Sequence, residues 1–370
     1  MKFVTLFLKT ENVHLLKDVG MIPYYLMKEH GVDSNVVTYR NSDEYSYIDN
    51  EVSGLGLTFV RKTRFGKIID GMWYLIKNGH RIDVLNIYHL NLSSYFYELA
   101  YRIVNRRGKI YLKLDMNPKG IKSCLKKDPT GIIKRATIRR ADIASVETTE
   151  MYRRLRKFYG DKILYVPNGC YKGAWTNSRD AGTGADKENI ILTVGNLGTY
   201  EKATDVLLEA YAGYVEASPE SDWRLRLAGS VDEGFKKYID DYFIRYPGLK
   251  DRVIFTGVIT DKAALDEEYR KAKIFVLPSL SESFGIVLVE AAARGDYLIT
   301  SDMVPAGYDI SHKFENGMAV KAGDAGSLLR AFKTMCDEPH DWNKMAERTA
   351  AYVSKSFDWS RIAAYLSTRL

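Results

Sequence analysis

Short apolar segments with strand character alternate with helical segments along the whole chain, and this alternation restricts the possible folds more than any other feature. The helical segments include residues 66–78 and 130–141. Apolar strands that alternate with helices favour parallel sheets built from crossover units. In the first half, the predicted strands are KFVTLFL (2–8), SNVVTYR (34–40), LGLTFVR (55–61), DVLNIYHL (83–90), KIYLKLD (109–115), DIASV (142–146) and KILYVPNG (162–169).

The pattern stops once and then starts again. A hydrophilic segment, YKGAWTNSRDAGTGADKEN (171–189), marks a domain boundary near residue 170. The sequence therefore predicts an α/β protein with two doubly wound domains, 1–169 and 170–352, and an amphipathic terminal helix at 353–370. The strands predicted for the second domain are IILTVGNL (190–197), WRLRLAG (223–229), RVIFTG (252–257), IFVLPS (274–279) and YLITSD (297–302).

Length and composition narrow the class of protein. A chain of 370 residues, 46% of them hydrophobic, suits two cores better than one. No apolar run approaches the ~20 residues of a membrane span, and the first residues read as a strand rather than a signal peptide. The three cysteines, Cys124, Cys170 and Cys336, are scattered, which is typical of a reducing compartment. We therefore expect a cytoplasmic protein.

The charges are distributed unevenly between the two halves. Residues 1–165 contain 29 Lys and Arg against 17 Asp and Glu, a net charge of +12, whereas the remainder carries a net charge of −5. This asymmetry indicates that the first half faces an anionic partner, and both nucleic acid and an anionic membrane surface are candidates.

Two basic segments are candidates for a membrane contact. In residues 61–77, apolar residues fall on roughly one helical stripe between basic residues, which suits a helix lying on an anionic membrane. A core-facing helix with a solvated basic edge would show the same pattern. The stripe consists of Phe65, Ile68, Ile69, Met72, Trp73 and Ile76, its flanks of Arg61, Lys62, Arg64, Lys67 and Lys77, and a second cluster of Lys122, Lys126, Lys127, Lys134, Arg135, Arg139 and Arg140.

The stretch SESFGIVLVEAAARG (281–295) places two carboxylates in an unusual setting. It reads as a loop after a strand that leads into a very apolar helix. Glu282 belongs to the loop, and Glu290 follows after seven intervening residues, inside the helix. Ligands of open parallel sheets bind outside the carboxyl ends of the strands, and free N–H groups at the helix start suit a phosphate. A helix with one solvated edge is the alternative interpretation.

With these two carboxylates in this setting, the sequence resembles the retaining glycosyltransferases with two Rossmann-like domains, known as GT-B, and among them family 4. The resemblance covers nearly the whole chain and is strongest over residues 189–325. It is carried by the Glu282 and Glu290 spacing within LPSLSESFGIVLVEAAARG, and by the segments ILTVGNL, EKATDVLLEAY, VIFTGVI, ENGMAVKAGD and YVPNG. It implies two Rossmann-like doubly wound domains facing across a cleft. The first would bind the acceptor and the second the nucleotide sugar, with the terminal helix returning to the first.

The resemblance also assigns roles to single residues. Glu290 would bind the ribose hydroxyls and Glu282 the hydroxyls of the donor sugar. Lys202 would stabilise the departing diphosphate from the side opposite the helix N-terminus, as a fixed cation can. The implied catalytic set is Lys202, Glu282 and Asp115, and the implied donor-binding set is Gly20, Gly195, Asn196, Lys202, Glu282, Ser283, Phe284, Gly285, Ile286 and Glu290.

The chain departs from the family pattern at three positions. Asn196 stands where members usually carry an arginine, and Ala203 where a glycine usually follows the lysine. Asp115 ends a strand at which members often carry a histidine, although a turn or cap aspartate would look the same. Lys113, on the same strand face as Asp115, and His89 are further candidates on the acceptor side.

The function implied is transfer of a hexose, with retention, from a nucleotide-diphosphate sugar to a hydroxyl of a glycan or lipid-linked acceptor. Cell-surface polysaccharide or glycolipid synthesis is the expected setting, at the inner face of the cell membrane. No metal and no cofactor are expected, since N–H groups and lysine serve the phosphates. The alternatives are a catalytically weak or inactive GT-B partner protein, suggested by Asn196, and a basic nucleic-acid-binding protein, for which no recognition motif is present. The sequence does not indicate an oligomeric state.

Overall fold

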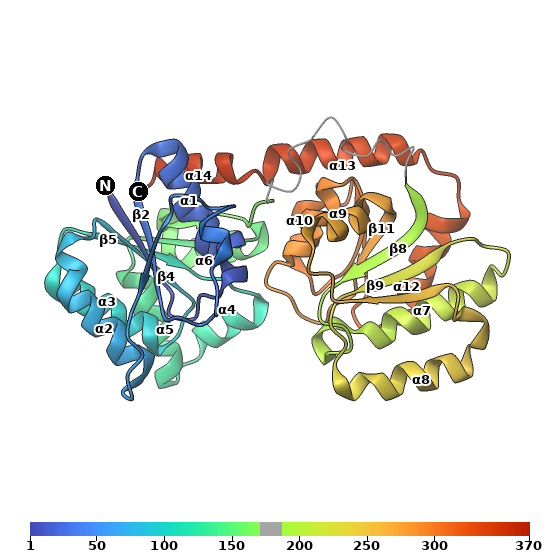
Figure 1. Ribbon diagram of the computed structural model, residues 1–370, viewed down its shortest axis with the longest axis horizontal. Coiled ribbons are helices and arrows are strands. Elements are labelled where there is room, and N and C mark those ends of the chain that lie inside the picture. Colours follow the sequence, from blue (N-terminus) through green and yellow to red (C-terminus); the bar gives the residue numbers. More distant parts are fainter. Residues whose placement is uncertain (171–186) are drawn as a thin grey trace. The chain divides into compact units, whose positions relative to one another are not determined.

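The computed structural model describes residues 1–170 and 187–370. The chain forms two compact units (Figure 1). Unit 1 consists of Met1–Gly169 and Phe357–Leu370, and unit 2 of Cys170–Ser356. The terminal segment of unit 1 thus starts at Phe357 rather than at residue 353, because the preceding helix continues to Ser356. Of the hydrophilic segment predicted to mark the boundary, residues 171–186 lie outside the described residues.

Unit 1 is built on a sheet whose neighbouring strands all run parallel. In its described part the sheet has seven strands in the order β3-β2-β1-β4-β5-β6-β7. The direction of strand addition reverses between β1 and β4, so a topological switch point lies there. The strands are β1 (Lys2–Leu6), β2 (Asp33–Thr38), β3 (Gly56–Phe59), β4 (Val84–Tyr88), β5 (Lys109–Lys113), β6 (Ile143–Val146) and β7 (Ile163–Tyr165).

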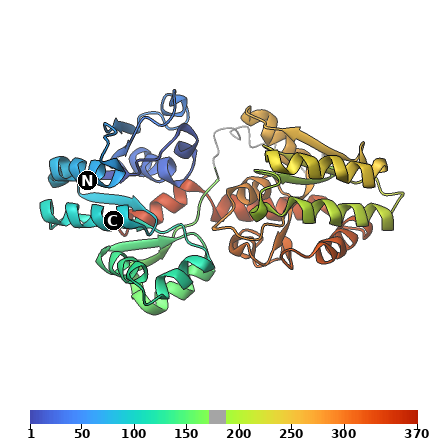
Figure 2. The same ribbon diagram turned by 90° about the horizontal axis from the view of Figure 1, so that it is seen from below.

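The helices of unit 1 cover this sheet. Helix α2 packs on α3 and α3 on α5, whereas the C-terminal helix α14 packs on α1, as Figures 1 and 2 show. The last residues of the chain therefore belong to the first Rossmann-like unit. The helices are α1 (Asp18–His30), α2 (Gly66–Asn78), α3 (Leu92–Val104), α4 (Pro118–Leu125), α5 (Pro129–Arg140), α6 (Thr149–Tyr159) and α14 (Trp359–Ser367).

Local sequence signals explain several helix starts in unit 1. The side chains of Asn91, Asp128 and Thr148 each accept a hydrogen bond from a backbone N–H in the first turn of α3, α5 and α6. Such caps stabilise a helix by about 0.5–2 kcal/mol. Asn91 and Thr148 follow the ends of β4 and β6 within three residues, so these two caps also fix where the next crossover begins.

Unit 2 repeats the architecture. Its sheet, in the described residues, has six parallel strands in the order β10-β9-β8-β11-β12-β13, and the switch point lies between β8 and β11. The strands are β8 (Glu188–Val194), β9 (Arg224–Ala228), β10 (Val253–Gly257), β11 (Ala272–Leu277), β12 (Tyr297–Ser301) and β13 (Gly317–Val320).

The helices of unit 2 pack in two groups. Helix α7 contacts α12, and α10 contacts α9, α11 and α13. The core between helices and sheet is apolar, and residues such as Leu208, Ile274 and Ile299 are fully buried. The helices are α7 (Thr204–Ala217), α8 (Lys236–Arg245), α9 (Lys262–Lys271), α10 (Ile286–Ala293), α11 (Pro305–Ile310), α12 (Ala325–Phe332) and α13 (Trp342–Ser356), and the 3-10 turn Tyr200–Lys202 precedes α7.

Candidate active site

The switch point of unit 2 brings together the two loops that carry most of the predicted donor-binding residues. One loop follows β8 and contains Gly195 and Lys202, and the other follows β11 and contains Glu282. A backbone hydrogen bond from Leu280 N–H to Glu201 O, 2.8 Å long, ties the two loops together. Sequence-distant segments thus form a single crevice edge at the place where open α/β sheets bind ligands.

Lys202 and Glu282 form an ion pair at this edge. The Lys202 Nζ contacts Glu282 Oε1, and Ser279 Oγ donates to the same oxygen over 3.1 Å. The side chains are 27% and 15% exposed, so both groups can be reached from solvent while their position is fixed. The structure therefore places the predicted phosphate-binding cation and the predicted sugar-binding carboxylate side by side.

The loop after β8 needs close backbone contacts and a left-handed backbone conformation. Gly229 has φ 137°, and a Cβ on it would lie 1.9 Å from the carbonyl oxygen of Gly195, so two glycines let the loops after β8 and β9 approach closely. Asn196 is exposed, and its Oδ1 accepts a hydrogen bond from Ser230 Oγ at 3.0 Å. Ala203 lies in the left-handed region with φ 49°, which costs an alanine about 1–2 kcal/mol. The usual glycine at this position avoids that cost.

Glycine is also required where α10 begins. Gly285, with φ 83°, is the N-cap residue, and a Cβ on it would lie 2.9 Å from Leu277 Cδ2. Phe284 is buried and anchors the loop, whereas Ser283 and Ile286 are half-buried beside it. The first-turn N–H groups of α10 thus directly follow the loop that carries Glu282.

Glu290 is held by a residue that the sequence did not reveal. It lies five residues beyond Gly285 in α10, roughly 7–8 Å along the helix. The hydroxyl of Tyr269, a residue of α9 that is only 2% exposed, donates to Glu290 Oε2 over 2.8 Å. Burial raises the pKa of Tyr269 well above its ordinary value, and Glu290 adds to the shift. Tyr269 therefore stays a proton donor that orients this carboxylate.

The switch point of unit 1 carries a second group of candidates. His89 follows β4 and Asp115 follows β5, and both have left-handed backbones, with φ 64° and 44°. His89 Nδ1 and Asp115 Oδ2 are 3.7 Å apart, and both side chains are more than one third exposed. Strained residues of this kind cluster at functional sites. A cavity of about 120 Å³ opens beside His89, and its lining includes Phe7, Lys9, Lys67, Tyr88 and Asn91.

Lys113 was predicted to be an acceptor-side residue, but its side chain is buried and does not line this cavity. It is fully buried, pairs with Glu147, and lies 3.7 Å from Asp18 Oδ2. Burial alone would lower the pKa of Lys113, but Glu147 and Asp18 raise it above its ordinary value. Burial raises the pKa of Glu147 to about 7, against the attraction of Lys113. Glu147 also accepts hydrogen bonds from Asp115 N–H and Met116 N–H. The buried Lys113 and Glu147 pair therefore holds the loop after β5 in place.

Gly20, implied as a donor-binding residue, lies in the first turn of α1. The helix begins at Asp18, and a Cβ on Gly20 would lie 2.1 Å from the carbonyl oxygen of Leu15. Gly20 is therefore required for the close approach of the preceding 3-10 turn to α1. Its implied contact with the donor phosphates stays a prediction.

The residues that the sequence analysis missed fall into two groups. Tyr269 meets Glu290 only through tertiary packing, so no local pattern marks it. Ser279 and Glu147 carried a usable signal, since each follows a buried strand directly, at the edge where parallel sheets bind ligands. Among residues 1–170 and 187–370, no group of three or more His, Cys, Asp or Glu side chains is arranged to hold a metal ion.

Comparison with known proteins finds a family whose model matches part of this chain. Residues 176–355 match the family model described as glycosyl transferases group 1. The chain is 31% identical over 179 residues to D-inositol 3-phosphate glycosyltransferase 2 of Catenulispora acidiphila, covering 47% of this chain and 41% of that protein. It is 26% identical to the phosphatidyl-myo-inositol mannosyltransferase of Mycobacterium leprae, covering 60% of this chain and 58% of that protein. The match thus spans about half the length of these curated relatives.

Solved structures extend the likeness to the whole chain. The structure of Anabaena Alr3699/HepE in complex with UDP-glucose superposes with a TM-score of 0.74 at 15% sequence identity, covering 100% of both chains. At this identity the superposition establishes the fold and not the substrate. The fold is that of the GT-B glycosyltransferases, which confirms the predicted fold class.

Proposed function

Since residues 176–355 belong to the glycosyl transferases group 1 and the chain has the GT-B fold, we propose that this protein is a glycosyltransferase that uses a nucleotide-diphosphate sugar. The observation that carries the proposal is the assembly of Lys202, Glu282 and the α10 N-terminus at the switch point of unit 2. Glycosyltransferase relatives and a fold neighbour that binds UDP-glucose support it. The sugar moved is a hexose, and the acceptor is a hydroxyl of a glycan or a lipid-linked molecule.

The geometry suggests which residue would contact each part of the donor. The diphosphate lies against the first-turn N–H groups of α10, which favour anions. Lys202 meets the charge that develops on the leaving diphosphate. Glu282 accepts hydrogen bonds from the sugar, and Glu290 from the ribose farther along the helix. The reaction retains the configuration of the sugar, uses no metal, and lets the leaving phosphate oxygen take the acceptor's proton.

A donor screen tests the proposal. A thermal-shift panel of nucleoside diphosphates and nucleotide sugars should show stabilisation by one nucleotide class, because a ligand that binds only the folded state raises its stability by mass action. The donor selected in this way should then be hydrolysed slowly by the purified chain. Binding without any hydrolysis or transfer would favour the alternative of an inactive GT-B partner protein, and no binding by any nucleotide would refute the proposal.

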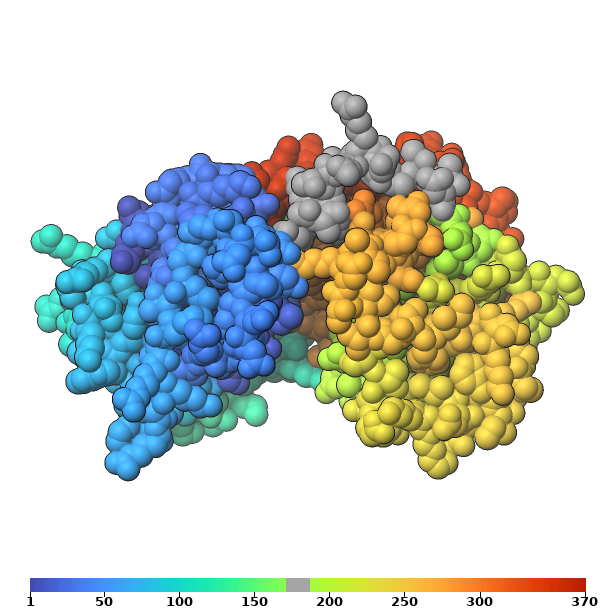
Figure 3. Space-filling view, in the orientation of Figure 1, coloured from blue at the N-terminus to red at the C-terminus, as the bar shows by residue number. Residues whose placement is uncertain are grey.

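We further propose that unit 1 contacts an anionic membrane through α2. Phe65, Ile69, Trp73 and Ile76 are 64%, 49%, 58% and 45% exposed, and their spacing places them on one face of the helix. Residues 61–78, in the blue part of the colour bar, lie at the surface of unit 1 in Figure 3. Ile68 and Met72, predicted to share this stripe, are half-buried. An exposed apolar stripe with basic flanks is typical of interfacial helices.

The second basic cluster contributes only in part. Lys122, Lys126, Lys127 and Arg139 are exposed. Lys134 and Arg135 are instead tied to Ser123 Oγ and to the carbonyl oxygens of Cys124 and Lys126, and Arg140 pairs with Glu98. No described helix is long and apolar enough to cross a bilayer. From the exposed stripe of α2 and its basic flanks, the proposed location is the surface of a membrane facing the cytoplasm.

Vesicle flotation should show binding to phosphatidylcholine vesicles that contain phosphatidylglycerol, and binding should weaken as salt rises, since exposed charges are screened over ~10 Å at 0.1 M. Trp73→Glu should abolish most of this binding. Phe158→Glu is the matched control, because Phe158 is an equally exposed aromatic residue on α6. Equal binding to neutral and anionic vesicles, or to DNA in preference to vesicles, would contradict the proposal.

Tyr269→Phe should weaken binding of the nucleoside diphosphate about two- to tenfold, which corresponds to roughly 0.5–1.5 kcal/mol for one hydrogen bond. The reason is that Glu290 loses the donor that orients it. Tyr246→Phe is the control, since Tyr246 donates to Glu209 Oε2 at 3.2 Å, away from the candidate site. Titration calorimetry measures both variants, and wild-type affinity in Tyr269→Phe would remove this role.

A further inference from the structure

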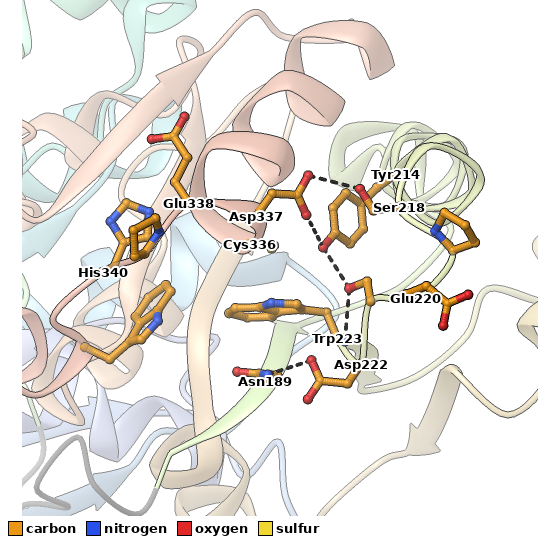
Figure 4. A pocket seen from close by; sticks show the side chains of 14 residues that line it. Asn189, Tyr214, Ser218, Glu220, Asp222, Trp223, Cys336, Asp337, Glu338 and His340 are labelled. Atoms are coloured by element: carbon orange, nitrogen blue, oxygen red, sulfur yellow. Dashed lines mark hydrogen bonds between the residues drawn. The ribbon is translucent and has the colours of Figure 1, made fainter.

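Figure 4 shows a cleft in unit 2. Its lining residues place it at the opposite edge of the sheet from the donor loops. Its volume is about 480 Å³, within the usual range for small-molecule sites. Asn189 lies near the start of β8, and Ser221 and Trp223 directly precede β9, so the cleft opens at the amino-terminal ends of these strands. Because β8 has seven residues, roughly 20–24 Å separates this edge from the donor loops.

Two indoles form the apolar part of the cleft. Trp223 and Trp342 have ring centroids 5.6 Å apart, and Trp342 is partly exposed at the start of α13. Lys273 Nζ lies 5.8 Å from the centroid of the Trp223 ring and 5.6 Å from that of the Trp342 ring, so both rings make a cation–π contact with this lysine. Trp223 is only 4% exposed, so Trp342 provides the indole surface that a ligand can reach, and this surface suits the apolar face of a neutral ligand.

The polar part of the cleft consists of acceptors that are already fixed in position. The Asp337 carboxylate accepts hydrogen bonds from Tyr214 OH at 2.9 Å and Ser218 Oγ at 3.0 Å. Asp222 Oδ1 accepts from Asn189 Nδ2 at 2.7 Å, as Figure 4 shows. A carboxylate has more lone pairs than one such bond uses, so it can also accept from a ligand hydroxyl. Preorganised acceptors of this kind reduce the entropic cost of binding.

The charge of the lining selects among ligands. Glu220 and Glu338 join Asp222 and Asp337, and among the fourteen described residues that line the cleft none is a lysine or arginine. Lys273, which donates to Asn189 Oδ1 at 2.6 Å beside the cleft, offsets only part of this negative charge, so anionic ligands such as nucleotides and uronic acid chains are disfavoured. A neutral sugar fits, because its hydroxyls donate to carboxylates and its C–H face stacks on an indole. We propose that this cleft binds a neutral glycan chain, as a non-catalytic site separate from the donor site.

Such a site has a use that rests on the proposed glycosyltransferase function. A growing glycan held at this cleft stays at a high effective concentration near the enzyme without any new contact at the reacting sugar. Binding at the cleft itself is independent of turnover. If the glycosyltransferase proposal is wrong, the wild-type chain should bind no nucleotide. If only the glycan-site proposal is wrong, the chain should bind a nucleotide but no neutral glycan.

Titration of the full chain with maltotetraose, cellotetraose and mannotetraose, each compared with tetragalacturonic acid, tests the proposal. At least one neutral tetrasaccharide should bind, and the anionic one should not. Trp342→Ala should weaken that binding at least tenfold, whereas Trp73→Ala, which removes an exposed tryptophan of unit 1, should leave it unchanged. Nucleoside diphosphate affinity should stay the same in both variants.

A filling variant covers the case in which Trp342→Ala does not fold. Ser218→Trp keeps both indoles and places a third side chain in the cleft, and it should also lower tetrasaccharide affinity at least tenfold. The proposal is overturned when no neutral tetrasaccharide binds, when the cleft variants bind like the wild type, or when Glu282→Gln rather than the cleft variants abolishes binding.

Discussion

Lys202→Ala should keep the fold and reduce sugar transfer by roughly two orders of magnitude or more, the scale of losing one preorganised charge contact in a transition state. Lys202 is placed for this role by its ion pair with Glu282 and by the turn that precedes α7. Asn196 stands where an arginine would add a second cation, so we expect the enzyme to depend strongly on the remaining lysine.

Steady-state transfer rates and a thermal unfolding curve measure this effect. Lys237→Ala is the matched control, because Lys237 is 85% exposed and pairs only along its own helix with Asp241. The control should turn over normally. Near-normal transfer in Lys202→Ala would show that another cation holds the leaving diphosphate.

Lys113→Met should lower the free energy of unfolding by about 3–5 kcal/mol, because it leaves the buried Glu147 and the partly buried Asp18 without their cation. Adding Glu147→Gln should recover part of the loss. Lys119→Met, an exposed position in α4, should change stability little. Denaturant titration at constant pH measures the three variants, and a deficit no larger than that of Lys119→Met would mean that the buried charges are not coupled.

The deficit should also depend on pH in a defined direction. Burial raises the pKa of Glu147 to about 7 from 4.5, so the folded state binds its proton more tightly than the unfolded chain, and stability falls as pH rises through this window. Without Lys113 that pKa rises further. The variant should therefore approach the wild type near pH 5 and differ most above pH 7, and the opposite trend would contradict this account.

The fold could be predicted far better than the site. Strand and helix alternation fixed both parallel sheets, since each buried strand is a nearly continuous apolar run, and residues 66–78 coincide with α2. The sequence also predicted that Glu282 lies in a loop after a strand and Glu290 in the following helix, and the structure has β11, this loop and α10 in that order. Contacts across the sequence were not predictable, and Tyr269 with Glu290 is the clearest case.

The same limit explains the error at Lys113. The expectation that Lys113 shares a strand face with Asp115 assumed that the strand continues to Asp115, but β5 ends at Lys113 and Asp115 has a left-handed backbone. The packing of Glu147 and Asp18 around the lysine decides that it is buried. Asp115 and His89 reach the surface because each follows its strand in a left-handed turn.

The central claim is that Glu282 and Glu290 bind different parts of one donor molecule. Calorimetric titration with uridine diphosphate, combined with measurement of donor turnover, tests this claim most directly. Glu290→Gln should weaken binding of the nucleotide about ten- to hundredfold, since a charged hydrogen bond is worth roughly 1.5–3 kcal/mol. Glu282→Gln should leave that affinity nearly unchanged but lower turnover and loosen the choice of donor sugar. Wild-type affinity and turnover in both variants would contradict the assignment of this site, and with it the proposed function.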